Sequence, residues 1–282
     1  MATLFTKDAS AIIPEQVAQD LLIQPLIDTS ILLNPAVSKT VVTGNHSIRF
    51  PRLTQEASAA WVAEGAEIPE TGIAVGDVVI TPGKIAALSN VTKEAAEDSD
   101  PAAQELLGQS MIRGIRAKLD SSFINSKNVP TLANPEPTGL AGLTGATEAE
   151  LALADLDSFV EASYAIAGLG GNATAFLVSE ADALAIATLK TGTGSNQNLI
   201  EQSQPGVTTI NGLPLIVVPD LPAGTAYAVD AASIISVVRK DATVETSDAP
   251  YWSSDRLSVK TTMRASWGFA DPARVVRMTT AA

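Results

Sequence analysis

The stretch WVAEGAEIP, at Trp61–Pro69, constrains this chain more than any other feature, because it is too polar to form a core of its own. Runs typical of β-strands flank it, at Ser47–Leu53 and Val75–Val91. Two strands joined by a long, half-polar segment predict a hairpin that projects from its domain. A lone hairpin is marginally stable in water, so this arm needs a surface to rest on. A second copy of the same chain is the simplest such surface.

Composition limits the classes of protein to consider. The 282 residues suffice for one large domain or two modest ones, and 46% of them are hydrophobic. Acids outnumber bases, 31 against 18, which argues against a surface built to neutralise nucleic-acid phosphates. The absence of cysteine excludes disulfides and thiolate metal sites. No signal peptide or apolar membrane span is visible, so we expect folding in the cytosol and no membrane partner.

The segment that precedes the hairpin has two interpretations. A helical pattern begins at Pro14, and the residues Ile27, Ile31 and Leu32 are too apolar for a free tail. They fit either an extended arm that packs on a neighbouring molecule or a segment that packs on its own body. The sequence leaves both open.

A long helix is predicted after the hairpin. Asp100 can cap it, Pro101 stands at its first position, and it runs to about Ser126, or about 37 Å. Its apolar stripe consists of Leu107, Met111, Ile115, Leu119 and Phe123. Such a helix can serve as the spine of the surrounding sheet.

The middle third of the chain alternates between helical and strand patterns and predicts a compact α/β unit inserted into the first domain. Ser179 is expected to cap a helix there, and Asn211-Gly212 to form the turn between two strands. From Asp241 onward, long alternating strands return, as expected of a sheet that packs on the spine helix.

No catalytic constellation emerges. The single histidine, His46, lies in a predicted turn, and no nucleophile motif accompanies it. The glycine-rich stretch at Gly168–Ala173 follows a helix and precedes a strand, the reverse of a dinucleotide-binding motif. Acidic clusters lack the spacing of calcium loops, and helix N-termini or solvated faces explain them. We therefore expect neither enzymatic activity nor a cofactor or metal.

Charge is distributed unevenly along the chain. Between Glu56 and Asp77 there are five acids and no base, whereas five bases and one acid follow from Arg256 to the end. This pattern favours head-to-tail association, with the arm of one copy on the body of the next; unrelated solvated faces are the alternative. The expected arm contacts are Trp61, Glu64, Glu67, Pro69 and Glu70, and their candidate basic partners are Arg113, Arg116, Arg256, Lys260 and Arg264.

The order of these parts resembles the major capsid proteins of tailed bacteriophages, whose fold also occurs in herpesvirus shells and encapsulins. The resemblance covers nearly the whole chain, and no single piece of it is decisive. It rests on WVAEGAEIPE at Trp61–Glu70, KIAALSNVTKEAAEDS at Lys84–Ser99, NGLPLIVVPDLP at Asn211–Pro222, VVRKDATVETSDAPYWSSD at Val237–Asp255, RASWGFADPARVV at Arg264–Val276 and the helix ending LDSSFINS.

The resemblance implies an α+β capsid fold with four parts. These are an N-terminal arm (1–45), an extended hairpin called the E-loop (46–84), a peripheral domain with the spine helix (85–143 and 241–282) and an inserted axial domain (144–240). It also implies self-assembly into hexamers and pentamers, which form an icosahedral shell around double-stranded DNA. The expected location is the virion, after assembly in the host cytoplasm.

Two departures from the family bear on these expectations. Some members join neighbouring subunits by a Lys–Asn isopeptide bond, but residues 54–83 contain no lysine and residues 256–282 neither Asn nor Glu, so we expect noncovalent contacts only. Only about 45 residues precede the hairpin, so scaffolding is expected from a separate protein, beside a portal protein; a chain that is already trimmed is the alternative. An encapsulin-type compartment is the alternative, although the position of the hairpin and the WVAEGAEIP type of arm favour a phage capsid.

Overall fold

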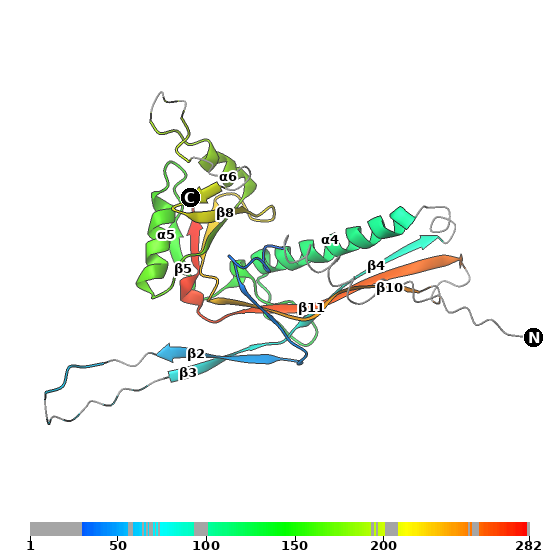
Figure 1. Ribbon diagram of the computed structural model, residues 1–282, viewed down its shortest axis with the longest axis horizontal. Coiled ribbons are helices and arrows are strands. Elements are labelled where there is room, and N and C mark those ends of the chain that lie inside the picture. Colours follow the sequence, from blue (N-terminus) through cyan, green and yellow to red (C-terminus); the bar gives the residue numbers. More distant parts are fainter. Residues whose placement is uncertain are drawn as a thin grey trace, which may run out of the picture.

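The structure, a computed structural model, describes residues 30–280 apart from 56–58, 64, 66, 68–69, 71, 73, 93–100, 193–194, 196, 201–207, 248 and 250–253. An elongated part and a compact part make up this α+β fold (Figure 1). The helices are α4 (Pro101–Asn125), α5 (Asp157–Gly168) and α6 (Glu180–Ala187), with 3-10 turns at η2 (Leu140–Gly142) and η4 (Pro272–Arg274). The strands are β1 (Lys39–Val42), β2 (Ile48–Gln55), β3 (Ala74–Ile80), β4 (Gly83–Thr92), β5 (Thr147–Glu150), β6 (Ala175–Val178), β7 (Thr208–Ile210), β8 (Leu213–Val217), β9 (Thr225–Val229), β10 (Ile234–Ser247), β11 (Arg256–Phe269) and β12 (Val276–Thr279).

The elongated part is a four-stranded sheet, in the order β1-β10-β11-β4, with α4 along one face (Figure 1). The predicted spine helix is confirmed, because α4 begins at Pro101 and ends at Asn125. Of the predicted stripe, Met111, Ile115, Leu119 and Phe123 are buried. They meet the sheet through the residues of β11 that point toward the helix, such as Met263. The spacing of apolar residues thus determines both the helix and the face that it buries.

The compact part is a six-stranded sheet in the order β5-β12-β9-β6-β8-β7. The core on one of its faces contains residues of α5 and α6, and its other face belongs to the main core beside α4. The sequence predicted two local features correctly. The Ser179 hydroxyl caps α6 by accepting a hydrogen bond from the Asp182 N–H at 3.1 Å, and Asn211-Gly212 form the turn between β7 and β8 with φ of 52° and 79°.

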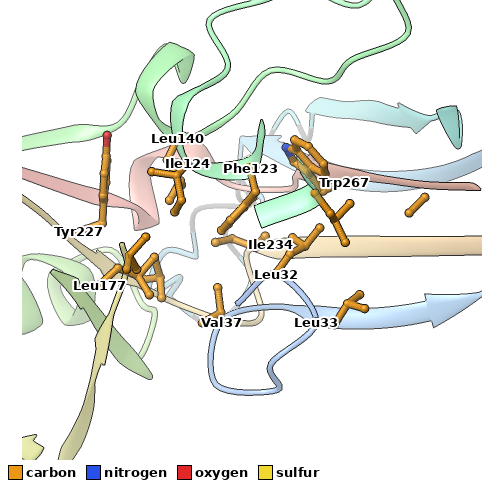
Figure 2. Packing of buried hydrophobic residues seen from close by; sticks show 14 of the residues in the cluster. Leu32, Leu33, Val37, Phe123, Ile124, Leu140, Leu177, Tyr227, Ile234 and Trp267 are labelled. Carbon is orange, nitrogen blue, oxygen red and sulfur yellow. The ribbon is translucent and has the colours of Figure 1, made fainter. Parts of the chain in front are cut away.

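One apolar core joins the two parts. Figure 2 shows Phe123 and Ile124 of α4 in one cluster with Leu177 of β6 and Tyr227 of β9, and Leu32 and Val37 lie below Phe123. The Phe123 ring lies edge-on to Trp267, with their centroids 5.7 Å apart. Because residues from both sheets share this core, the compact part cannot move without disturbing the end of the spine helix.

The residues that form each of the two larger sheets differ from the ranges expected for the peripheral and axial domains. β10, which lies in the four-stranded sheet, begins at Ile234 rather than after residue 240, and β12 lies in the six-stranded sheet although residues 241–282 were expected beside the spine. Asp230 separates β9 from β10 by a tight turn, in which its carboxylate and carbonyl accept the N–H groups of Ala232 and Ser233, each at 2.9 Å. β9 and the beginning of β10 are mainly apolar, so the sequence pattern indicates one continuous strand there.

A similar division occurs in the expected run Val75–Val91, which forms two strands. β3 pairs with β2 in the projecting ribbon, and β4 pairs with β11 in the four-stranded sheet. The chain changes partner at Thr81-Pro82, where proline supplies no N–H for a ladder.

The connector after α4 lies unusually close to the end of the helix. The Gly139 N–H donates to the Ser126 carbonyl at 2.8 Å. A Cβ at Gly139 would lie 2.5 Å from the carbonyl oxygens of Ser122 and Phe123. Only glycine permits this approach, which holds the connector against the helix terminus.

Residues 30–38 pack on their own body, as in the second interpretation of the leading segment. Leu32, Leu33 and Val37 are buried in the main core, and Ile31 packs against it. The helical pattern from Pro14 and the residue Ile27 lie outside the described residues.

The buried carboxylate of Asp120 fastens this segment to α4. It accepts hydrogen bonds from the Ser30 hydroxyl at 2.7 Å and from the Leu32 N–H at 3.2 Å, and the Arg116 guanidinium lies 3.6 Å away. Burial raises the pKa of Asp120 above its ordinary value, although these hydrogen bonds and Arg116 act in the opposite direction. The folded chain therefore binds a proton at Asp120 more readily than the unfolded chain does.

We expect Asp120→Asn to gain stability relative to the native chain as the pH rises from about 4 to neutral. A raised carboxyl pKa contributes stability at low pH that is lost as the pH rises, and asparagine cannot ionise. Urea denaturation of both proteins across this range measures the difference, and a difference that stays flat or falls would contradict the assignment. As a control, Asp120→Ala should cost about 2–4 kcal/mol, because two buried donors lose their acceptor.

Candidate functional site

The ribbon formed by β2 and β3 projects from the face of the four-stranded sheet opposite α4 (Figure 1). Its root is fixed by a small core around Ile80, Ile235 and Val237. The Ile80 side chain approaches Gly268 so closely that a Cβ there would lie 2.8 Å from it. Arg49 and Asp77 form an ion pair across the ribbon at 3.2 Å. The body therefore holds the base of the arm firmly.

Beyond this base, the arm contacts little. Every residue that the structure describes between β2 and β3 is exposed, including Glu67 and Glu70, and Trp61 is 106% exposed. The other two expected contact residues, Glu64 and Pro69, lie outside the described residues. The aromatic surface of Trp61 is thus left uncovered in the single chain, and an exposed aromatic side chain of this kind suits contact with another surface.

A groove of about 430 Å³ lies beside the root of the arm, on the same face of the sheet. We call it the cationic groove, because five bases line it. Its lining residues are Gly44, Lys84, Arg239, Lys240, Glu245, Lys260, Thr262 and Arg264. β11 supplies Lys260 and Arg264 from positions that alternate with those facing α4, so both side chains point away from the helix.

Strand pairing concentrates the positive charge. Arg264 on the central strand β11 lies directly opposite Lys240 of β10 on one side and Lys84 of β4 on the other. The register between β10 and β11 shifts on both sides of Lys240, and this irregularity brings Arg239 into the lining as well. Three cations in a row across adjacent strands repel one another.

One acid offsets part of this charge. The Glu245 carboxylate accepts a hydrogen bond from the Lys260 ammonium at 2.7 Å. This hydrogen bond is the main reason that the pKa of Glu245 lies below its ordinary value, and the charges of Lys260, Lys240 and Lys84 add to it. The bases of the groove therefore favour the ionised form of the carboxylate beside them.

The structure brings together only two of the five expected basic partners, Lys260 and Arg264. Arg113 and Arg116 lie on α4, across the sheet from the groove, and Arg116 neighbours Asp120. Arg256 is at the start of β11, eight positions before Arg264, or about 26 Å along the strand. Sequence reasoning missed Lys84, Arg239 and Lys240, since only the pairing of distant strands and the irregularity in β10 unite them with Arg264.

Other kinds of site are not apparent in the described part of the chain. It holds no group of three or more His, Cys, Asp or Glu residues that could bind a metal ion. None of its helices has the length and apolar content needed to cross a bilayer.

Comparison with known proteins identifies the family. The model of the phage capsid family matches residues 9–280, nearly the entire chain. The chain belongs to the phage capsid family. It is accordingly a structural protein of the capsid, of the kind that forms the main shell component of tailed phages.

Individual relatives agree with this assignment. A capsid polyprotein of Pseudomonas phage PAJU2 is 26% identical over 184 residues, which are 62% of this chain but only 26% of the polyprotein. The chain therefore spans about a quarter of the length of that curated relative.

Solved structures share the fold. A chain from Mycobacterium phage Bobi superimposes with a TM-score of 0.71 at 19% identity, covering 100% of both chains. One from Microbacterium phage Oxtober96 has a TM-score of 0.72 at 15% identity and covers 89% of this chain and 91% of that one. The capsid of an empty GTA particle has a TM-score of 0.71 at 19% identity, over 89% and 92% of the two chains.

Proposed function

We propose that copies of this capsid protein assemble into hexamers and pentamers, which build the icosahedral shell of a tailed phage around its double-stranded DNA. In this proposal the chain has no enzymatic role. Scaffolding and portal proteins act as separate partners, and assembly in the host cytoplasm yields a virion in which each arm lies on a neighbouring subunit.

The exposed arm carries this proposal. Trp61 is 106% exposed, and the described residues around it are exposed too, so the arm gains nothing from its own body. An aromatic side chain buries about 150–250 Å² when it is covered. At about 25 cal/mol per Å², covering Trp61 on another copy offers about 4–6 kcal/mol before the cost of ordering the arm.

The geometry of the contact also favours closed assemblies. An arm that leaves one part of the chain and rests on a different part of the next copy is a head-to-tail contact. Such contacts repeat until the rotation closes a ring, and rings of five and six copies tile an icosahedral shell. Family membership supports this form of assembly over a filament.

We expect the reversal of Glu64, Glu67 and Glu70 to lysine to weaken assembly about tenfold or more at low salt, because it removes the charge attraction of the arm for a basic body. The defect should change with salt, since screening weakens interactions between exposed charges. Light scattering across a concentration and salt series measures it. Unchanged assembly of the triple variant would remove the arm acids from the contact.

The contents of purified particles test the wider proposal. A phage shell is expected to contain DNA and a portal protein, whereas an encapsulin-type compartment would contain a cargo enzyme. Mass spectrometry and nucleic-acid extraction distinguish these outcomes, and cargo enzyme without DNA would overturn the proposal.

A further inference from the structure

The cationic groove has more positive charges than its own acid can neutralise, because five bases and one acid line it. Lys240, Arg264 and Lys84 stand in one row across three adjacent strands. Glu245 offsets one charge and already forms an ion pair with Lys260. Like charges directly opposite one another destabilise a sheet. The chain has a formal charge of −13 but gathers five bases in this groove, and such a local excess of positive charge favours the binding of an anion.

We propose that this groove is the binding site for the carboxylates of the acidic arm of an adjacent copy, an inference that rests on the proposed function. The arm has the complementary composition, with five acids and no base between Glu56 and Asp77. Its described acids beyond the ribbon, Glu67 and Glu70, are exposed and available for such a contact. The bases of the groove would thus be the contact residues on the neighbouring copy, and three of them, Lys84, Arg239 and Lys240, were not expected from the sequence.

The ribbon that carries the arm leads away from the groove of its own chain. Gly44 lines the groove just before β2 begins, so the arm starts at the edge of the groove. Figure 1 shows the β2–β3 ribbon running from there away from the four-stranded sheet. The groove of one copy and the arm of another are therefore free to meet, and the same contact can repeat around a ring.

DNA phosphates are the competing anion. The arm is favoured because the net charge of the chain repels a polyanion as long as DNA. A short acidic segment, by contrast, brings only a few carboxylates, which match the few cations of the row.

A charge swap tests the inference. The groove variant carries Lys84→Glu, Lys240→Glu and Arg264→Glu, and the arm variant carries Glu64→Lys, Glu67→Lys and Glu70→Lys. We expect each variant alone to raise the concentration needed for assembly about tenfold or more. The variant that carries all six substitutions should assemble at nearly the native concentration. The combination also restores the native net charge, so a general charge effect cannot explain its recovery.

A matched control alters three exposed bases outside the groove, by Lys39→Glu, Arg113→Glu and Lys127→Glu. This control should assemble much more readily than the groove variant. Thermal melts of the unassembled chains establish that every variant is folded. A groove variant that assembles normally, or one that assembles but loses DNA, would overturn the inference and leave the proposed function standing. If the native chain itself forms no assembly, the proposed function fails instead.

The lack of cysteine in the chain permits a direct second readout. Glu67→Cys in one chain and Lys240→Cys in a second, differently tagged chain are mixed and treated with a short bis-maleimide. The inference predicts a crosslinked pair that contains both tags and diminishes at high salt. Absence of this pair in assembled particles would contradict it, and so would a pair that forms no better than the one between Glu67→Cys and the control Lys39→Cys.

Discussion

Replacing residues 56–73 with Asn-Gly should abolish assembly and leave the body of the protein folded. Gln55 and Ala74 are paired across the ribbon, so a two-residue turn joins β2 to β3 without disturbing their register. The described residues removed by this change are exposed in the single chain, so the melting temperature should stay nearly the same. The loss of Trp61 and the arm acids removes several interface contacts at once, which predicts a decrease in assembly of about a thousandfold.

A second variant separates the length of the arm from its side chains. It keeps all the residues between β2 and β3 but replaces them with a Gly/Ser sequence, which lacks both the tryptophan and the acids. Size-exclusion chromatography and sedimentation should show both variants as folded, unassembled chains. Assembly of the Asn-Gly variant at native concentrations would show that the arm is dispensable and would contradict its proposed role.

Phe123→Ala should destabilise the folded chain by about 3–5 kcal/mol, the range for removal of a buried aromatic ring. Phe123 is 0% exposed, lies edge-on to Trp267 and stacks with Phe269 at 6.5 Å. It also lies where the spine helix meets the compact part (Figure 2), so a cavity there loosens both parts. Urea denaturation of the unassembled chain measures the loss.

Two further substitutions serve as controls for the loss of stability in Phe123→Ala. Phe123→Leu retains much of the buried volume and should cost distinctly less, whereas Leu132→Ala, at a side chain that is 104% exposed, should cost almost nothing. A loss below about 1 kcal/mol for Phe123→Ala would mean that this core does not hold the two parts together.

Local signals in the sequence predicted the elements that they control. Pro101 and the apolar stripe predicted α4, Ser179 predicted the start of α6, and Asn211-Gly212 predicted the β7–β8 turn. In each of these cases the physical cause lies within a few residues, because capping, helical periodicity and turn conformation are local effects.

Such local signals could not predict which strands pair when they are distant in the sequence. Nothing near Val276 indicates that β12 pairs with β5 and β9, and nothing near Lys84 indicates that it faces Arg264. The arm could be inferred because its polar composition is local, but the groove that we propose to receive it could not, since three strands distant in the sequence create it. Of the expected basic partners, Arg113 and Arg116 lie on the helix, on the other side of the sheet.

Electron microscopy of particles formed by the purified chain tests the central claim most directly. The account predicts closed shells or rings of five and six copies, in which density for each arm crosses onto the cationic groove of an adjacent subunit. Single chains at every concentration, each with its arm folded back onto its own surface, would contradict it.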